Sequence, residues 1–231
     1  MLDEQGKNAN NVNIPTKKAY HHGNLRAALV AAALKEIAKT GPDGFSLREV
    51  ARRAGVSAPA VYRHFKDKDA LLAAVAIECS ERIQAAMALA LANAPADTLE
   101  RFRAVGIAYV RFAVEHPEHF RAMSTPNLFE RMPQEEQARV NESNAAQRLA
   151  IAHAQAAGEI AAIPIDDLIL TATALTHGIA NMIVEGKLGE VDVVRATELA
   201  VRATAVLGAG FAPRSERYED PRGVLKLPGR P

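Results

Sequence analysis

Two stretches of the sequence hold side chains whose types and spacing could do chemistry. The run SAPAVYRHFKDK, residues 57–68, gathers basic and aromatic side chains beside small ones. Cationic and hydroxyl side chains bond to the phosphate oxygens of nucleic acids, and small residues let a backbone approach a groove closely. The run EHPEH, residues 115–119, combines imidazole and carboxylate groups that could bind a metal ion or transfer protons.

The second stretch gives the weaker signal. His116 and His119 are three residues apart, a spacing that can hold zinc on a helix. Pro117 between them disfavours a regular helix, and the H-E-x-x-H order of zinc proteases is absent. We therefore expect a solvated helix junction, with no metal site and no cofactor. A helical enzyme that uses the Glu115–His119 cluster remains an alternative, although no arrangement of nucleophile, base and orienting group is visible.

The residues before the first stretch carry helix start and stop signals. Ser46 and Glu49 fit the S-x-x-E capping box, in which each residue satisfies a free N–H group of the first turn. Gly55 is expected to end that helix, and Ser57 to cap the next one. Pro59 is tolerated there because the N–H groups of a first turn have no helical acceptor.

The second of these helices predicts a DNA reader. Val61 and Phe65, four residues apart, are expected to face inward, which leaves Tyr62, Arg63 and His64 on the outer side. Two short helices joined by a glycine-containing turn are typical of a helix-turn-helix that enters the major groove. An ordinary helical hairpin with a solvated face is the alternative. The capping box, the glycine turn and the clustered polar set together favour the DNA reader.

Charge is distributed unevenly along the chain. The whole sequence of 231 residues has a formal net charge of +1, but residues 17–80 hold 11 Lys and Arg against 6 Asp and Glu, a net +5. Residues 81–211 hold 11 basic against 16 acidic residues, a net −5. A basic first third joined to an acidic remainder suggests two tasks, the first with a polyanion as partner.

Residues 20–77 resemble the DNA-binding domain of the tetracycline-repressor (TetR) family. The resemblance rests on Gly-Phe-Ser at 44–46, Ala-Gly-Val-Ser at 54–57, Tyr-x-His-Phe at 62–65 and Lys-Asp-Lys-Asp-Ala-Leu-Leu at 66–72. It implies an all-α fold with three N-terminal helices for DNA, a linking fourth helix and a larger helical domain. We accordingly expect a disordered arm (1–18), a DNA-binding domain (19–80, helix-turn-helix about 46–65), a ligand-binding and dimerisation domain (81–211) and a disordered tail (212–231).

The same resemblance implies which side chains meet DNA. Ser46 and Arg48 would contact backbone phosphates, and Lys66 and Lys68 would clamp a phosphate at the start of the next helix. Tyr62 and its small neighbours would lie against the groove floor or the sugar-phosphate wall. The full predicted set is Ser46, Arg48, Ser57, Ala58, Pro59, Tyr62, Arg63, His64, Lys66 and Lys68.

The C-terminal half resembles one branch of that family. Two stretches are similar to the characteristic segments of a branch named for a Trp-His-Gly motif: AYVRFAVEHPEHFRAM (108–123) and ALTHGIANMIVEG (174–186). This chain has no tryptophan, and Thr176 precedes His177 and Gly178. The role of the missing aromatic residue is therefore not carried over.

An apolar pocket is expected in this half, because ligand sites pair hydrophobic walls with a few polar groups. The alternatives stay open: scattered Phe and Met residues also build plain cores, and His177 could instead cap a helix carbonyl or pack at a dimer interface. The candidate lining residues are Phe112, Phe120, Met123, Phe129, His177 and Met182.

The resemblance implies a homodimeric repressor that leaves a near-palindromic double-stranded DNA operator when an unknown apolar or amphipathic small molecule binds. The last two helices, expected at about 165–185 and 191–207, would pair with their copies across a two-fold axis. A regulator controlled by a protein partner without any ligand is the alternative.

The setting expected from the sequence is the cytoplasm, at the nucleoid. Cys79 is the only cysteine, so no disulfide can form within the chain, and a structural thiol is favoured over a redox sensor. The first 18 residues hold no apolar segment of signal-peptide length, and no uncharged apolar run is long enough to cross a membrane. We expect no membrane partner.

Overall fold

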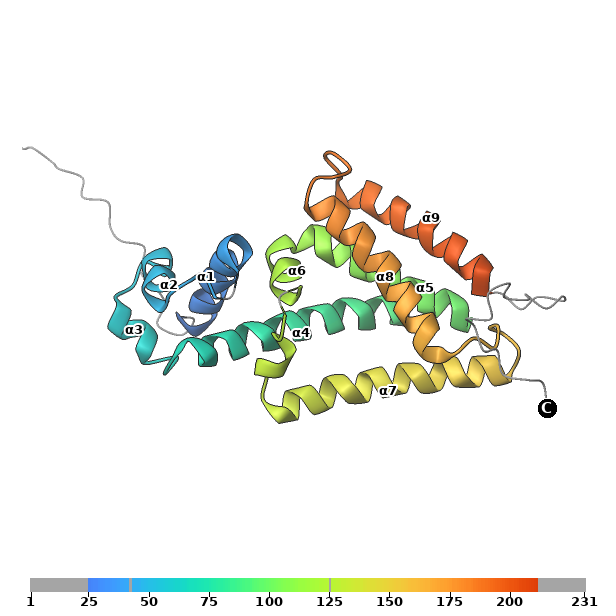
Figure 1. Cartoon of the computed structure of the whole chain (residues 1–231), viewed down its shortest axis with the longest axis horizontal. Helices are drawn as coiled ribbons and strands as arrows, with labels where there is room; N and C mark the ends of the chain where they lie inside the picture. Colours follow the sequence, from blue (N-terminus) through green and yellow to red (C-terminus); the bar gives the residue numbers. More distant parts are fainter. Residues whose placement is uncertain (1–24, 42, 125, 212–231) are drawn as a thin grey trace, which may run out of the picture.

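The computed structural model of the chain describes residues 25–41, 43–124 and 126–211, so the predicted arm and tail lie outside the described residues. The described part is helical and contains no strand, which confirms the expected all-α fold (Figure 1). Its elements are α1 (Leu25–Thr40), α2 (Leu47–Ala54), α3 (Ala58–Tyr62), α4 (Lys68–Asn93), α5 (Thr98–Glu115), α6 (Pro117–Met123), η2 (Phe129–Arg131), α7 (Gln134–Ala156), α8 (Ile165–Val184) and α9 (Val193–Phe211).

Helices α1 to α3 and the first two turns of α4 form a compact unit, here called the head (Leu25–Val75). The capping box of α2 is confirmed: the Ser46 hydroxyl accepts from the Glu49 N–H at 3.3 Å, and the Ser46 N–H donates to the Glu49 carboxylate at 2.7 Å. Gly55 ends the helix with φ 69°, a left-handed conformation that glycine adopts without strain. Ser57 does occupy the N-cap position of α3, but its side chain makes no capping hydrogen bond, contrary to expectation.

The head is closed around a continuous apolar core. Val50 and Val61 are fully buried, and only 2% of Phe65 is exposed. The Glu36 carboxylate on α1 is buried beside this core, and it forms an ion pair with Arg53 on α2. A buried charge needs such a partner, so this pair fixes α1 against α2.

Helix α4 links the head to the rest of the molecule. It runs from Lys68 to Asn93, and Figure 1 shows it extending from the head alongside α5 and α7. The predicted break at His116-Pro117 is confirmed, since α5 ends at Glu115 and α6 begins at Pro117. Segments α6 and η2 reach back to the head, and Ala122, Leu128 and Met132 belong to its buried core. The boundary expected at residue 80 therefore falls inside α4, and residues beyond it help to fill the head.

Helices α5, α8 and α9 pack together as the body of the C-terminal region (Thr98–Phe211). Gly106 allows the close approach, because a Cβ atom there would lie 2.9 Å from the Thr176 methyl group. The last two helices were expected at 165–185 and 191–207, and α9 extends further than that. By length and composition α8 could cross a membrane, and only 22% of its most apolar window is buried within the chain. Its apolar residues are thus available to another surface.

Helix α7 contributes little to any core. It spans 23 residues, but only Ile151 and Ala154, near its C-terminal end, are buried. Figure 1 shows it running beside α4 along one side of the molecule. Such a helix leaves space beneath it, and the structure contains two cavities there.

Candidate nucleic-acid interface and ligand cavities

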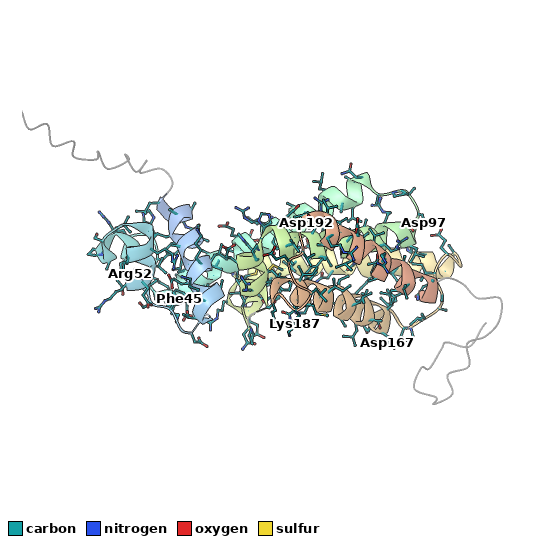
Figure 2. The ribbon with its side chains drawn as sticks, turned by 90° about the horizontal axis from the view of Figure 1, so that it is seen from above. Phe45, Arg52, Asp97, Asp167, Lys187 and Asp192 are labelled. Carbon is teal, nitrogen blue, oxygen red and sulfur yellow. The ribbon has the colours of Figure 1, made fainter. Side chains whose placement is uncertain are left out.

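The predicted DNA contacts lie at one end of the elongated molecule. Figure 2 places Phe45 and Arg52 of the head at this end, with Asp97 and Asp167 toward the other. Tyr62 is 53% exposed, although the neighbouring Val61 is fully buried. Most of the set is exposed and the rest is partly exposed: Ser46, Arg48, Ser57, Pro59, Tyr62, Arg63, His64 and Lys66, then Ala58 and Lys68. The burial pattern agrees with the direction that periodicity indicated, and the contacts themselves stay a prediction.

Lys68 is held in place before any ligand arrives. Its Nζ donates to the Asp43 carbonyl at 2.9 Å and lies 4.6 Å from the centre of the Phe45 ring. An ammonium group has three donors, so protons remain for a phosphate oxygen. Lys66, by contrast, has a side chain that is 84% exposed and only 3.7 Å from the Asp67 carboxylate. The two lysines therefore differ in preorganisation.

Ser46 is already engaged by its own helix. Besides accepting from Glu49, its hydroxyl donates to the Glu49 carboxylate at 2.8 Å. These hydrogen bonds, with the nearby Arg52 and Lys68 as smaller influences, lower the pKa of Glu49. A phosphate contact from the Ser46 hydroxyl would compete with this bond. Arg48, two residues further along the chain and exposed, is the better placed of the two for a phosphate.

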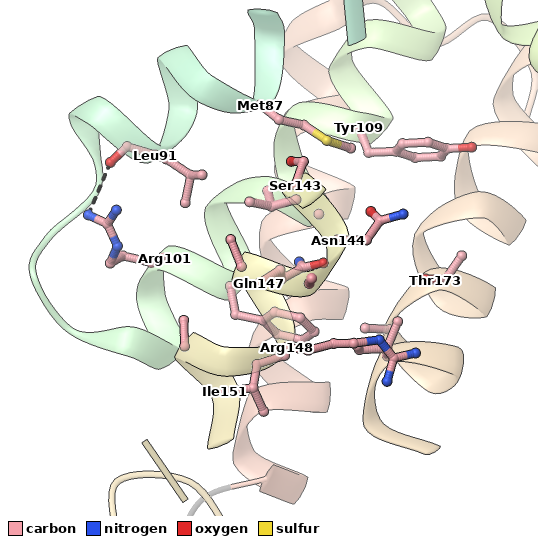
Figure 3. A pocket seen from close by; sticks show the side chains of 18 of the residues that line it. Met87, Leu91, Arg101, Tyr109, Ser143, Asn144, Gln147, Arg148, Ile151 and Thr173 are labelled. Carbon is pink, nitrogen blue, oxygen red and sulfur yellow. Dashed lines mark hydrogen bonds between the residues drawn. The ribbon is translucent and has the colours of Figure 1, made fainter. Parts of the chain in front are cut away.

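The larger cavity has a volume of about 960 Å³ and lies between α4, α5, α7 and α8 (Figure 3). This volume is at the upper end of the range typical of small-molecule sites. Phe102, Val105 and Ile151 supply apolar wall, and Asn144, Gln147 and Thr173 supply polar groups. Arg101 and Arg148 also line it.

A smaller cavity of about 270 Å³ adjoins the first on the side of the head. Its walls come from α4, α5, α6, η2 and α7, and they include Cys79, Met123, Phe129 and Met132. Four residues line both cavities and form the neck between them: Met87, Tyr109, Ser143 and Asn144.

The six residues predicted to line a pocket take different positions. Met123 and Phe129 line the smaller cavity. Phe112 and Phe120 are buried in the core instead, at 2% and 1% exposure. Met182 lies 41% exposed on α8. Two of the six thus line a cavity, and ligand binding by them stays a prediction. Arg101, Asn144 and Arg148 also line a cavity, and sequence reasoning missed them because polar residues on a weakly amphipathic helix or near a helix end give no pocket signal.

His177 does not line either cavity, but it contacts Tyr109, which lines both. Its Nδ1 is 2.9 Å from the hydroxyl of Tyr109, to which it is hydrogen bonded. Burial raises the pKa of the Tyr109 phenol, which keeps it protonated at neutral pH. The ring of His177 also packs 5.3 Å from that of Phe120. His177 therefore orients Tyr109, which lines both cavities.

The imidazole cluster at residues 115–119 packs at a helix junction. Burial lowers the pKa of His119, against the effect of its hydrogen bond to Glu78 at 3.4 Å. His116 lies beside it, with ring centres 5.5 Å apart. Over the described residues, no group of three His, Cys, Asp or Glu side chains is placed to hold a metal ion. Burial also raises the pKa of the nearby Cys79 thiol to about 12, so the reactive thiolate is not formed near neutral pH.

Comparison with known proteins agrees with this architecture. Residues 29–75 match the family described as bacterial regulatory proteins, tetR family, and residues 102–207 match the tetracyclin repressor-like, C-terminal domain. A protein of unknown function from Rhodococcus sp. RHA1 is 35% identical, and the match covers 85% of this chain and 100% of that one with a TM-score of 0.65. The chain belongs to the TetR family. Both stretches that resembled the Trp-His-Gly branch lie within the second matched segment.

Other proteins match over larger or smaller shares of the chain. A TetR family transcription regulator from Marinobacter aquaeolei VT8 has the same fold, with a TM-score of 0.70, 24% identity and coverage of 83% of this chain and 97% of that one. The tetracycline repressor protein class D of Escherichia coli is 40% identical over 57 residues, 25% of this chain and 26% of its own length. An HTH-type transcriptional repressor of Mycobacterium tuberculosis is 36% identical over 77 residues, 33% of this chain and 39% of its own length. The match thus spans about a quarter of the first of these curated relatives.

Proposed function

We propose that this TetR protein is a homodimeric transcriptional repressor, which binds a near-palindromic DNA operator and is released by a small amphipathic ligand. The observation that carries the proposal is the head itself. A closed apolar core leaves Arg48 and Tyr62 exposed and Lys68 partly exposed in and beside a helix-turn-helix, in a segment with net positive charge. That arrangement suits a phosphate-lined groove. The same proposal puts the protein in the cytoplasm, where the operator is.

The exposed faces of α8 and α9 support a dimer. An interaction surface is indicated where a single chain leaves many large apolar side chains exposed close together. A two-fold pair would provide one head for each half-site of the operator. Five of the ten large apolar residues exposed in the described part of the chain lie on these two helices: Leu170, Met182, Val194, Val201 and Val206.

The cavities support ligand control over control by a protein partner alone. A core filled completely would leave a small molecule no place, whereas the space under α7 exceeds what packing defects leave. Release of DNA follows if the ligand binds more tightly to the conformation that cannot bind the operator. α6 and η2, which share the core of the head, connect the two regions.

The test is binding of the purified protein to a labelled duplex from upstream of its own gene, measured by fluorescence anisotropy across salt concentrations. Each neutralised phosphate adds about −0.9 to the log–log salt slope, so two heads give a steep dependence. Lys68→Ala is expected to reduce the magnitude of the slope by about 2, one contact in each head, and Tyr62→Ala to weaken specific binding.

Lys187→Ala is the matched control, because Lys187 is 60% exposed and pairs with Glu185 in the loop after α8, outside the head. It should leave the salt slope unchanged. If the wild-type protein shows no salt-sensitive binding to any duplex, the proposal is wrong. If Lys187→Ala reduces the slope as much as Lys68→Ala does, the interface lies elsewhere.

A further inference from the structure

The two cavities lie in series along α4. The smaller one is lined on α4 from Ala76 to Met87, and the larger one by Met87 and Leu91. From Ala76 to Leu91 a helix advances roughly 22 Å at 1.5 Å per residue. The order is the same on α7, where Val140 lines only the smaller cavity and Ile151 only the larger. Together they form a long, two-chambered site with Met87 and Asn144 at its neck.

Positive charge is confined to the chamber far from the head. Arg101 and Arg148 line the larger cavity, and no Asp or Glu is among its lining residues. The lining of the smaller cavity contains no Asp, Glu, Lys, Arg or His, and burial keeps its Cys79 thiol and Tyr109 phenol protonated. A ligand that fits both chambers is therefore anionic at one end and uncharged along the rest.

Neither arginine is fully neutralised where it lies. Arg101 donates to the Leu91 carbonyl at 3.3 Å, and no carboxylate of the described residues lies within ion-pair distance of it. Arg148 forms an ion pair with Asp166, whose side chain is 79% exposed and so screened by water. Guanidinium groups with donors left over are suited to carboxylate or phosphate oxygens.

The two arginines also give the site a direction. Arg101 precedes Tyr109 by about two turns of α5, and Arg148 follows Asn144 by about one turn of α7. Both therefore lie beyond the neck, on the side away from the head. Figure 3 shows them toward the edges of the pocket, with Gln147 and Ile151 between them. An anionic group held there would point the remainder of the molecule through the neck.

The wall of the smaller cavity belongs to the core of the head. Ala76, Leu128 and Met132 line it, and all three are members of the same buried cluster as Val50 and Phe65. A chain that enters this chamber touches the residues that position α1 to α4. A ligand confined to the larger cavity touches none of these three.

We propose that the effector is an elongated amphipathic anion, with its charged group in the larger cavity, attracted by Arg101 and Arg148 from either side, and its apolar tail in the smaller cavity against the core of the head. This inference rests on the proposed function and specifies its ligand. Length then decides the response: short anions bind without releasing DNA, and long ones bind and release it. The anionic group can be a carboxylate or a phosphate ester, which share this chemistry.

Direct binding tests the chemistry independently of DNA. Protein stripped of lipid is titrated by displacement of a fluorescent probe with hexadecanoate, octanoate, hexadecyl phosphate and hexadecyltrimethylammonium, each below its micelle concentration. Both long anions are expected to bind at least tenfold more tightly than the cation of equal length. Equal or tighter binding of the cation overturns the proposal, and a difference between the two long anions identifies the preferred group.

Three variants locate the two ends of the ligand. Arg148→Gln and Arg101→Gln are each expected to weaken hexadecanoate binding about tenfold, the size of one charge-assisted hydrogen bond. Arg139→Gln is the matched control, because Arg139 lies on α7, as Arg148 does, but pairs with Glu136 outside the cavities. Ser143→Trp blocks the neck at an exposed position of α7, so hexadecanoate should bind no better than octanoate.

The outcomes separate this inference from the proposed function. If hexadecanoate binds as described but no duplex binds, the repressor proposal fails and the ligand site stands. If DNA binds and neither arginine variant differs from Arg139→Gln, the ligand site fails and the repressor proposal stands. Release of DNA by octanoate as effective as release by hexadecanoate would show that the smaller cavity takes no part.

Discussion

The head and the C-terminal region differ in how completely the chain packs against itself. In the head, α2 has eight residues and α3 has five, yet four residues of α2 are buried, and so are Ala60 and Val61 of α3. In the C-terminal region, α7 has 23 residues and only two of them are buried. Short helices are marginal alone, so the head depends on its core for its shape. The long helix keeps its shape with little packing, and the space beneath it remains open.

The proposed function accounts for this difference. In that proposal the head meets DNA through polar and basic side chains on its outside. The C-terminal region has unfilled cavities and exposed apolar residues such as Leu170 and Val206, at 67% and 77% exposure. In the proposed function, a ligand would occupy these cavities and a second copy would cover these apolar residues. Four pairs of substitutions test whether the contrast holds.

The largest effect is expected in the core of the head. Phe65→Ala should lower the free energy of unfolding by about 3–5 kcal/mol, because Phe65 is 2% exposed and its removal leaves a cavity. Leu149→Ala on α7, where Leu149 is 58% exposed, should change it by about 0.5 kcal/mol or less. Urea unfolding followed by circular dichroism measures both. Comparable losses would mean that α7 is packed as the head is.

The next effect concerns the face of α8. Leu170→Glu is expected to weaken dimerisation about 100-fold or more, since an unpaired carboxylate would have to be buried in an apolar interface. Analytical ultracentrifugation across a dilution series measures this dissociation constant. Leu149→Glu, a similarly exposed leucine on α7, is the control. A Leu170→Glu protein that remains as dimeric as the control would remove α8 from the interface.

Ion pairs should show the same contrast at smaller scale. Arg53→Ala is expected to lower the free energy of unfolding by about 1–3 kcal/mol, because the buried Glu36 carboxylate loses its partner. Arg139→Ala breaks an exposed pair with Glu136 on α7 and should cost about 0.5 kcal/mol or less. Thermal or urea unfolding compares the two. A larger loss for Arg139→Ala would contradict the view that α7 is weakly integrated.

The smallest effect is a comparison of two N-caps within the head. Ser46→Ala should cost about 1 kcal/mol, because the capping hydrogen bond is lost. Ser57→Ala should be nearly neutral, since the Ser57 side chain makes no such bond. Equal losses in urea unfolding would mean that Ser57 does cap α3 in solution.

The features read correctly from sequence are those that depend on neighbours within about four residues. The capping box joins residues three apart, and Gly55 and Pro117 act on their own turn of the chain. Val61 and Phe65 are four apart and were placed inward by that spacing alone. The all-α fold follows from many such signals, and the family motifs of the head are equally local.

The pocket needed information that no local pattern carries. Its walls come from four helices, so each lining residue depends on how distant segments pack. The share of Met123 and Phe129 in the smaller cavity was anticipated only by residue type, and the same reasoning placed Phe112 and Phe120 in a pocket when they fill the core. Ser57 shows the same limit, because whether a capping residue makes its bond depends on its final geometry.

The sequence alone therefore determined the all-helical fold, the capping box of α2 and the inward and outward sides of the head, because these follow from backbone geometry within a turn or two. The tertiary structure alone decided that α6 and η2 complete the core of the head. It also decided that a neck divides the space under α7 and that two arginines line only the larger cavity. Burial of apolar surface has no direction of its own. Only the packed arrangement of helices determines which apolar side chains meet each other and which surround an empty space.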